Sequence, residues 1–331
     1  MTEVLKPTAK PAAPSASTPT RRRFDPLDFL REYGVLIIIV VLMVGLAVIS
    51  DSFLTPRNLL NILNQSTPLA LIAAALTLVI ISGGFDLSTG AIFGVASVTT
   101  AWVAVNFNPQ IALLVGPLVG LVLGIINGLI ITGFNVHSFL ATLATSLVFR
   151  GIAVLITGGA LIPVRMEEFA WIGRGKIGLV NYAVIILVIF TIAMMVLLNR
   201  TTFGRRVIAV GGNEEAAILS GVRTKLVKIA AFGLTGFASG LAGIIGVSRV
   251  SMGQPQAGTG MELDAIAAVI LGGTSIYGGA GAVWRSIAGV LLLALIDNGF
   301  NILNVNPFFK DLTTGVIIVV AVALSAGKRR R

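Results

Sequence analysis

Long apolar runs alternate with short polar connections along most of this chain. A helix that crosses a lipid bilayer needs about 20 mainly apolar residues. The runs predict spans at residues 34–50, 60–82, 88–106, 111–133, 139–157, 179–199, 229–248, 263–277, 287–304 and 311–326. One of these ten, 263–277, is short and punctuated by glycine, which predicts a broken or re-entrant segment shielded by protein or a cavity. The pattern therefore predicts an all-α polytopic membrane protein.

The two ends of the chain differ from this pattern. Residues 1–33 begin with a stretch rich in Pro, Ala, Ser and Thr and contain a cluster of arginines. We predict a disordered tail here, because the segment offers little apolar surface to bury. The first apolar run starts too late for a simple cleaved signal peptide and is interpreted as an uncleaved span. A transmembrane domain then covers residues 34–326, and 327–331 form a short basic end.

One hydrophilic stretch, residues 200–228, is long and basic and lies between the sixth and seventh predicted spans. Asn213 is a good helix N-cap, and Glu214 and Glu215 follow where the positive end of a helix dipole favours acidic side chains. Gly221 is a natural left-handed stop. The signals predict a helix of about two turns, roughly 10 Å long. Such a short helix is not stable alone, so it must dock against a partner.

Composition and charge agree with a membrane protein. Apolar residues make up 56% of the chain and charged residues 11%, with a mean hydropathy of +0.96, whereas a soluble domain is usually about one quarter charged. The net charge is +10, and most Lys and Arg residues lie at the two chain ends and in 200–228. Because cytoplasmic loops carry such an excess, both termini and this stretch are predicted to be cytoplasmic. Nucleic-acid binding is not indicated, since no groove-reading motif or aromatic platform accompanies the basic residues.

The sequence contains none of the residue sets typical of an enzyme. It has no cysteine and a single histidine, His137, which excludes cysteine chemistry and a histidine-rich metal cluster. A Walker A loop needs Ser or Thr after Gly-Lys, and the pairs at Lys176 and Lys328 both lack it. Hydrolase, zinc-protease and kinase motifs are also missing from the sequence. We therefore predict no catalytic residue, no metal site and no bound cofactor.

Few acidic residues lie within or beside the apolar segments. Asp86 and Ser88 follow a glycine pair and precede a span, so a turn or helix-cap role and a translocation-pathway role are both open. Asp297 lies inside a span, where either a structural polar cluster or a cavity-lining role fits. The candidates for the pathway are Asp86, Ser88, Asp264, Thr274, Asp297, Asn298 and Asn301.

Glycines recur at helical spacing on two predicted spans. One ladder consists of Gly116, Gly120, Gly124 and Gly128, and the other of Gly233, Gly236, Gly240 and Gly243. Such stripes let helix backbones approach closely in lipid, and we favour tight packing within one subunit over a channel wall or a dimer face. A faint repeat aligns 81–91 with 270–280, which predicts two weakly related halves, as in many transporters.

Four segments of the chain resemble a known family. They read ISGGFDLSTGAIFG from Ile81, VGGNEEAAILSGV from Val210, QPQAGTGMELDAIAAVILGGTSIYGGAGAV from Gln254 and DNGFNILNV from Asp297. They are similar to the ribose-type monosaccharide permeases of ABC importers, and the resemblance extends over about residues 40–330.

Within the second segment, Glu215-Ala216-Ala217 followed by Gly221 resembles the coupling motif of importer permeases. In the broader importer family this motif is followed by an Ile-x-Leu-Pro ending, and here no proline follows Gly221. The docking role is therefore carried over, whereas the full geometry of the loop is not. The residues expected to dock in the partner are Gly212, Asn213, Glu214, Glu215, Ala216, Ala217 and Gly221.

The resemblance implies a permease that moves a monosaccharide across the bacterial inner membrane by alternating access. It implies three partners: a tandem-domain ABC ATPase that binds ATP and Mg, a periplasmic sugar-binding protein, and a second permease copy in a homodimer or close heterodimer. Related permeases carry branched-chain amino acids, nucleosides or a sugar-like signal, so those substrates stay open. An ion-coupled secondary transporter, supported only by Asp297, and a simple membrane anchor are further alternatives.

Overall fold

The computed structural model describes residues 26–306 together with 309, 312–313, 315–316 and 319. The helices in this part of the chain are α1 (Pro26–Ile49), α2 (Pro56–Ile81), α3 (Thr89–Asn106), α4 (Pro109–Gly133), α5 (Ser138–Thr157), α6 (Glu167–Arg174), α7 (Tyr182–Arg200), α8 (Thr202–Gly212), α9 (Glu214–Leu219), α10 (Thr224–Val250), α11 (Met261–Leu271) and α12 (Val283–Ile302). Four two-residue strands join them: β1 (Ile162–Pro163), β2 (Lys176–Ile177), β3 (Val180–Asn181) and β4 (Met252–Gly253).

Seven of the described helices are long and apolar enough to cross a membrane, namely α2, α3, α4, α5, α7, α10 and α12. Each coincides with a predicted span, so the chain is a mainly helical, multi-pass membrane protein. The first predicted span falls on α1, whose apolar part, Tyr33–Ile49, is shorter. α1 begins at Pro26, earlier than the predicted start at residue 34. The predicted span 311–326 lies mostly outside the described residues.

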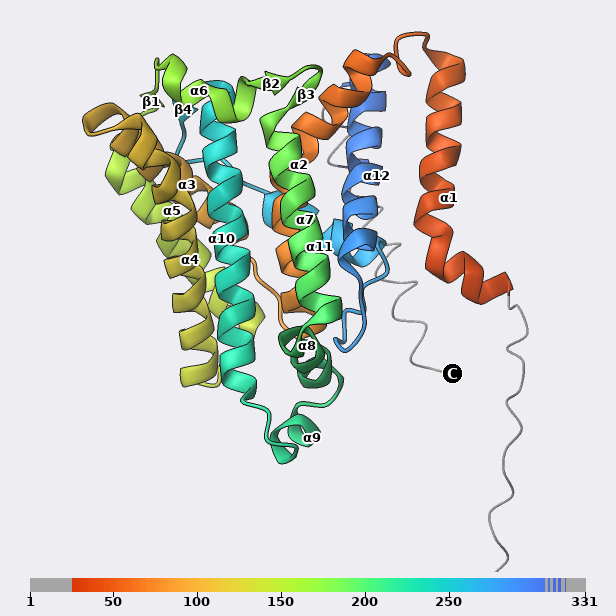
Figure 1. The fold of residues 1–331 in the computed structure, drawn as a ribbon, viewed down its shortest axis with the longest axis vertical. Helices are drawn as coiled ribbons and strands as arrows, with labels where there is room; N and C mark the ends of the chain where they lie inside the picture. The colour runs from red at the N-terminus through yellow and green to blue at the C-terminus, as the bar shows by residue number, and fades with distance from the viewer. Residues whose placement is uncertain (1–25, 307–308, 310–311, 314, 317–318, 320–331) are drawn as a thin grey trace, which may run out of the picture.

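The bundle has two distinct ends (Figure 1). α8 and α9 project from one of them, which we call the α9 end. α6 and the short strands cover the other, which we call the α6 end. There β1 pairs antiparallel with β4, joining Ile162 to Gly253, and β2 and β3 form a hairpin. The hydrophilic stretch 200–228 is thus separated from α6 and the short strands by the length of the helices.

Helix α2 forms the centre of the bundle. Its most apolar window is 83% buried, compared with 22% for α5. Thr55 caps α2 by accepting a hydrogen bond from the Asn58 N–H, and Pro56 occupies the first turn, where a missing N–H leaves no donor unused. The exposed apolar side chains of α5 are those expected to face lipid or a second subunit.

Helices α4 and α10 pack through their two glycine ladders. A Cβ built on Gly120 would overlap the Gly236 carbonyl oxygen, and one built on Gly240 would overlap the Gly116 carbonyl oxygen. Both backbones therefore touch directly, with no side chain between them. The prediction that the ladders pack within one subunit is confirmed for these four glycines.

The helical backbone is interrupted between α2 and α3, and the interruption is buried. Asp86 and Ser88 have no exposed surface. The peptide N–H of Phe85 donates to Ser138 Oγ at 3.0 Å, and that of Leu87 donates to Thr142 Oγ1 at 3.0 Å. Hydroxyls from α5 thus supply the partners that a helix would otherwise have supplied to this backbone.

The predicted span 263–277 is broken, as expected: its helical part starts two residues earlier than predicted and ends at Leu271. α11 covers Met261–Leu271, about 16 Å at 1.5 Å per residue, which is too short to cross a bilayer alone. The preceding segment, 254–260, is non-helical and lies against α3. Its carbonyl oxygens at Pro255 and Ala257 both approach to 3.1 Å of a Cβ built on Gly94.

The ends of α2 and α11 share one cap geometry. Gly83 and Gly273 have φ of +84° and +83°. The Gly84 N–H bonds to the Val79 carbonyl at 3.0 Å, and the Thr274 N–H bonds to the Val269 carbonyl at 3.2 Å. This geometry pairs Gly83 with Gly273, one residue away from the register of the sequence alignment, which paired Gly83 with Gly272.

The α4–α10 contact predicts that adding one methyl group to it destabilises the bundle. Gly120→Ala forces the two backbones apart, and overpacking of this kind costs about 1–3 kcal/mol. Gly133→Ala is the matched control, because a Cβ on that glycine of the same helix meets nothing within 4 Å. Thermal unfolding of the purified protein in detergent should show a lower midpoint for Gly120→Ala only; equal midpoints would contradict the direct backbone contact.

Candidate functional site

The hydrophilic stretch between α7 and α10 folds into two short helices at the α9 end. The sequence analysis did not predict α8, which starts where Thr201 Oγ1 accepts a hydrogen bond from the Gly204 N–H at 3.2 Å. It did predict α9. Asn213 Oδ1 accepts from the Ala216 N–H at 2.9 Å, and Gly221 has φ of +79°, so the predicted N-cap and stop are both confirmed.

α9 presents an apolar tip at the outer surface of the bundle. Ala217 is buried and anchors the helix. Ile218 and Leu219 are 54% and 90% exposed, and Glu215 is exposed beside them. An apolar tip of this kind, held on a capped helix and rimmed by charge, is typical of a surface that binds another protein.

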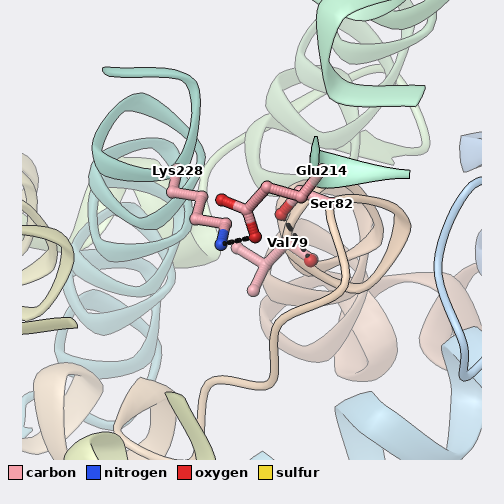
Figure 2. A network of polar contacts seen from close by, with 4 residues as sticks. All are labelled: Val79, Ser82, Glu214 and Lys228. Carbon is pink, nitrogen blue, oxygen red and sulfur yellow. Dashed lines mark hydrogen bonds and ion pairs between the residues drawn. The ribbon is translucent and has the colours of Figure 1, made fainter. Parts of the chain in front are cut away.

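The two acidic residues of α9 have different environments. Glu214 forms an ion pair with Lys228 of α10, with 2.6 Å between Oε2 and Nζ, so it ties the first turn of α9 to α10. Figure 2 shows this pair together with the Ser82–Val79 hydrogen bond at the end of α2. Glu215 is the acidic side chain that remains open to solvent. Glu214 therefore positions α9, and Glu215 is available to a partner.

α8 ends at a contact between three pieces of backbone, which we call the glycine joint. The Gly279 N–H donates to the Ile81 carbonyl at the end of α2, at 2.8 Å. A Cβ built on Gly211 would overlap that carbonyl oxygen and lie 2.7 Å from the Gly279 nitrogen. Only glycine fits between them, so α8 is in direct backbone contact with the end of α2 and with the connection that precedes α12. Gly212, selected in the sequence analysis, has open space where a Cβ would lie.

A cavity of about 510 Å³ lies among α2, α10, α11 and α12, in the half of the bundle toward the α6 end. Its walls are formed by Ile62, Gln65, Ser66, Leu69, Arg249, Met261, Asp264, Leu293, Ala294, Asp297 and Asn298. The volume is in the range of small-molecule sites. Carboxylate, amide, hydroxyl and guanidinium groups together offer both donors and acceptors. The cavity can therefore hydrogen-bond a small solute that carries hydroxyl groups.

The position of the cavity follows from the break before α11. Because 254–260 is non-helical and lies against α3, helical structure resumes only at Met261, and the cavity lies beside this start of α11. Met261 and Asp264, on the first turn of α11, line this cavity.

Arg249 reaches the cavity wall because of a proline in α2. Pro68 lacks an N–H, so the Asn64 carbonyl four residues earlier has no helical donor. Arg249 Nη1 donates to that carbonyl at 3.1 Å. The guanidinium therefore supplies the hydrogen bond that Pro68 cannot donate to the Asn64 carbonyl, and it also lines the cavity.

A reciprocal amide pair fixes Asn298. Its Nδ2 donates to Asn58 Oδ1 at 2.9 Å, and Asn58 Nδ2 donates to Asn298 Oδ1 at 3.1 Å. Asn58 also donates to the Phe53 carbonyl at 2.9 Å. Asn298 thus joins α12 to the start of α2 through a polar pair that the sequence analysis did not predict.

The structure brings together only some of the candidate pathway residues. Asp264, Asp297 and Asn298 line the cavity. Asn301 is exposed outside it. Thr274 is buried at the end of α11, away from the cavity lining. Sequence reasoning missed Gln65 and Arg249, although a glutamine inside an apolar run was a usable signal.

Asp86 and Ser88 belong to a separate buried cluster with Asn127 of α4. Asp86 Oδ1 accepts from the Ser88 N–H at 2.9 Å and from its hydroxyl at 2.6 Å. Asn127 Nδ2 donates to Ser88 Oγ at 2.7 Å. These bonds fix the turn that leads into α3. Among the described residues, no group of three or more His, Asp or Glu side chains is arranged to hold a metal ion.

Comparison with known proteins identifies a family that matches most of the chain. The family described as "Branched-chain amino acid transport system / permease component" matches residues 58–322. No solved structure gives a significant match to the sequence.

Several curated relatives align over nearly their full length. The ribose import permease protein RbsC of Bacillus subtilis (strain 168) is 41% identical over 93% of this chain and 96% of the relative. RbsC of Escherichia coli (strain K12) is 37% identical over 95% of this chain and 100% of the relative. The L-arabinose transport system permease protein AraH of the same strain is 36% identical over 98% of this chain and 97% of the relative.

Proposed function

This chain belongs to the permease family described as "Branched-chain amino acid transport system / permease component", and on that premise we propose that it is the membrane-spanning subunit of an ATP-driven monosaccharide importer. The observation that carries the substrate class is the identity of 36–41% to ribose and arabinose permeases over nearly the whole chain. The family description itself names branched-chain amino acids, so that substrate class is the alternative.

The proposed assembly has four parts. A tandem-domain ABC ATPase binds ATP and Mg and docks on α9, while a periplasmic sugar-binding protein docks at the α6 end. A second copy of the permease completes the pathway. The chain spans the bacterial inner membrane ten times, with two weakly related halves and both termini in the cytoplasm, as the distribution of Lys and Arg supports.

The proposed mechanism is alternating access driven from α9. ATP binding moves the ATPase domains, and α9 and α8 move with them. The glycine joint passes this displacement to α2, which also lines the cavity. A sugar in the cavity is held by hydrogen bonds from neutral and charged side chains and is released when the walls separate. Weak binding suits this role, because a deep energy minimum would slow release.

Transport assays in proteoliposomes test the function itself. Vesicles containing the permease and its ATPase, with ATP inside and the binding protein outside, should take up ribose or another monosaccharide. Leucine and valine serve as the substrates of the alternative branch. Uptake that continues without ATP hydrolysis and stops when ion gradients collapse would instead show a secondary transporter.

The cavity predicts a role for Gln65 in uptake. Gln65→Leu should lower sugar uptake several-fold without loss of the assembled complex. The substitution replaces an amide that can hydrogen-bond a sugar hydroxyl with an apolar group. Asn61→Leu, an exposed position one turn earlier on the same helix and outside the cavity lining, should transport normally. Radiolabelled sugar uptake measures both; equal rates for the two variants would remove Gln65 from the pathway.

The exposed acidic residue of α9 predicts a docking defect on charge reversal. Glu215→Lys should weaken capture of the ATPase about tenfold, equivalent to about 1.4 kcal/mol, while the protein stays in the membrane. Glu168→Lys makes the same change at an exposed site of α6, at the opposite end, and should leave capture intact. Normal capture and transport by Glu215→Lys would disprove the docking role.

The glycine joint predicts a variant that docks but does not transmit. Gly211→Ala pushes α8 away from Ile81 and Gly279. The number of sugar molecules transported per ATP hydrolysed should fall about fivefold or more, because the coupling free energy between two sites is typically about 1–3 kcal/mol. Gly133→Ala, at a position of α4 where a Cβ meets nothing within 4 Å and which is outside the docking set, is the control. ATPase capture and the thermal midpoint are measured on both variants. An unchanged ratio in a stable Gly211→Ala protein would show that the joint transmits nothing.

A further inference from the structure

A second cavity lies at the α9 end, between α8 and the start of α10. Its volume is about 390 Å³. It is lined by Phe203 and Arg206 of α8, by Gly221 and Arg223 between α9 and α10, and by Leu226, Val227 and Ala230 in the first turns of α10. The apolar tip of α9 does not line it. We call this space the basic groove. It shares Gly221 with the residues expected to dock in the ATPase and shares no residue with the cavity described above.

The apolar and the basic residues of the groove lie at different distances from the membrane. Arg223, Leu226 and Ala230 are spaced three and four residues apart, so they share one face of the helix over about 10 Å. The apolar run of α10 starts at residue 229, which puts Ala230 at membrane level and Arg223 beyond it. On α8, Phe203 is likewise one turn closer to the end of α7 than Arg206. Apolar surface therefore faces the membrane side, and guanidinium groups form the outer rim.

Both guanidinium groups at the rim are available. Arg206 and Arg223 are exposed, and within the described part of the chain neither forms a hydrogen bond or an ion pair. The carboxylate of Glu214 is already paired with Lys228. Two cationic groups at one rim, without a carboxylate of the described chain paired to either, favour an anionic group between them.

We propose that the basic groove binds an anionic phospholipid at the membrane surface. The phosphate lies at the guanidinium groups of Arg206 and Arg223, and an acyl chain follows Leu226 and Ala230 into the membrane. An acidic protein segment would pair with the two arginines of the rim but would leave the apolar surface at Leu226 and Ala230 uncovered. A zwitterionic lipid carries an ammonium group that two arginines disfavour, so the charge favours phosphatidylglycerol-like headgroups.

Native mass spectrometry of the full-length protein, titrated with phosphatidylglycerol or phosphatidylcholine, tests this site. Arg206→Gln combined with Arg223→Gln should weaken phosphatidylglycerol binding about 30-fold, taking roughly 1 kcal/mol, or fivefold, per arginine. The matched control is Arg205→Gln combined with Lys225→Gln. It removes the same charge from exposed positions of the same two helices outside the groove and should stay within about twofold of the unmodified protein.

Every other result overturns the site in a distinct way. An equal loss in both double variants means diffuse attraction to the surface, and no loss in either means that the groove is not the binding place. Displacement of the lipid by millimolar inorganic phosphate means a free-anion site. Loss of ATPase capture with unchanged lipid binding means a protein contact. Because the altered side chains are exposed, matching thermal midpoints will show that both variants are folded.

Discussion

The satisfaction of backbone polar groups at membrane depth is the constraint on which the rest of this structure depends. An unpaired peptide group costs several kcal/mol where water is excluded. The chain nevertheless leaves the helical state at 82–88 and at 254–260, where it lies against other helices. Hydroxyls of Ser138 and Thr142 satisfy the first break, and the glycines of α3 let the second lie directly on a helix. The cavity lies beside the second of these breaks, where α11 begins at Met261.

The glycine contact between α4 and α10 provides the rigid side of the bundle. Direct contact of two backbones at Gly120 and Gly236 leaves no side chain that can change rotamer. α2 packs on the other side of α10, with Pro68 and a replacement donor from Arg249. One side of the bundle is therefore fixed by backbone contact, and the other carries an interrupted helix beside a cavity. This asymmetry is what a transporter that moves one wall against another requires.

The elements that sequence predicted well are those specified by local signals. Seven spans follow from apolar run length, and α9 follows from Asn213 at its start and Gly221 at its end. α8 was not predicted, although Thr201 caps its first turn, because the run is too short and polar for a span and its inner face, Val207 and Val210, is buried only against the bundle. The cavity was predicted only in part. Arg249 donates to a carbonyl that lacks a helical partner because of Pro68, 181 positions earlier in the chain. No local sequence pattern relates two residues so far apart.

The single helix α2 connects the two regions to which we assign function. Ile81 at its end belongs to the glycine joint, and Ile62, Gln65, Ser66 and Leu69 near its start line the cavity. Within that lining segment, Pro68 removes one helical hydrogen bond, and a donor from Arg249 of α10 replaces it. In the proposed mechanism, a displacement at the joint reaches the cavity either by rotation of α2 as a rigid rod or by bending at Pro68. Bending would draw the Asn64 carbonyl away from Arg249 and leave that cavity-lining guanidinium without its backbone partner, so the position of the helix and the hydrogen-bonding capacity of the cavity wall would change together.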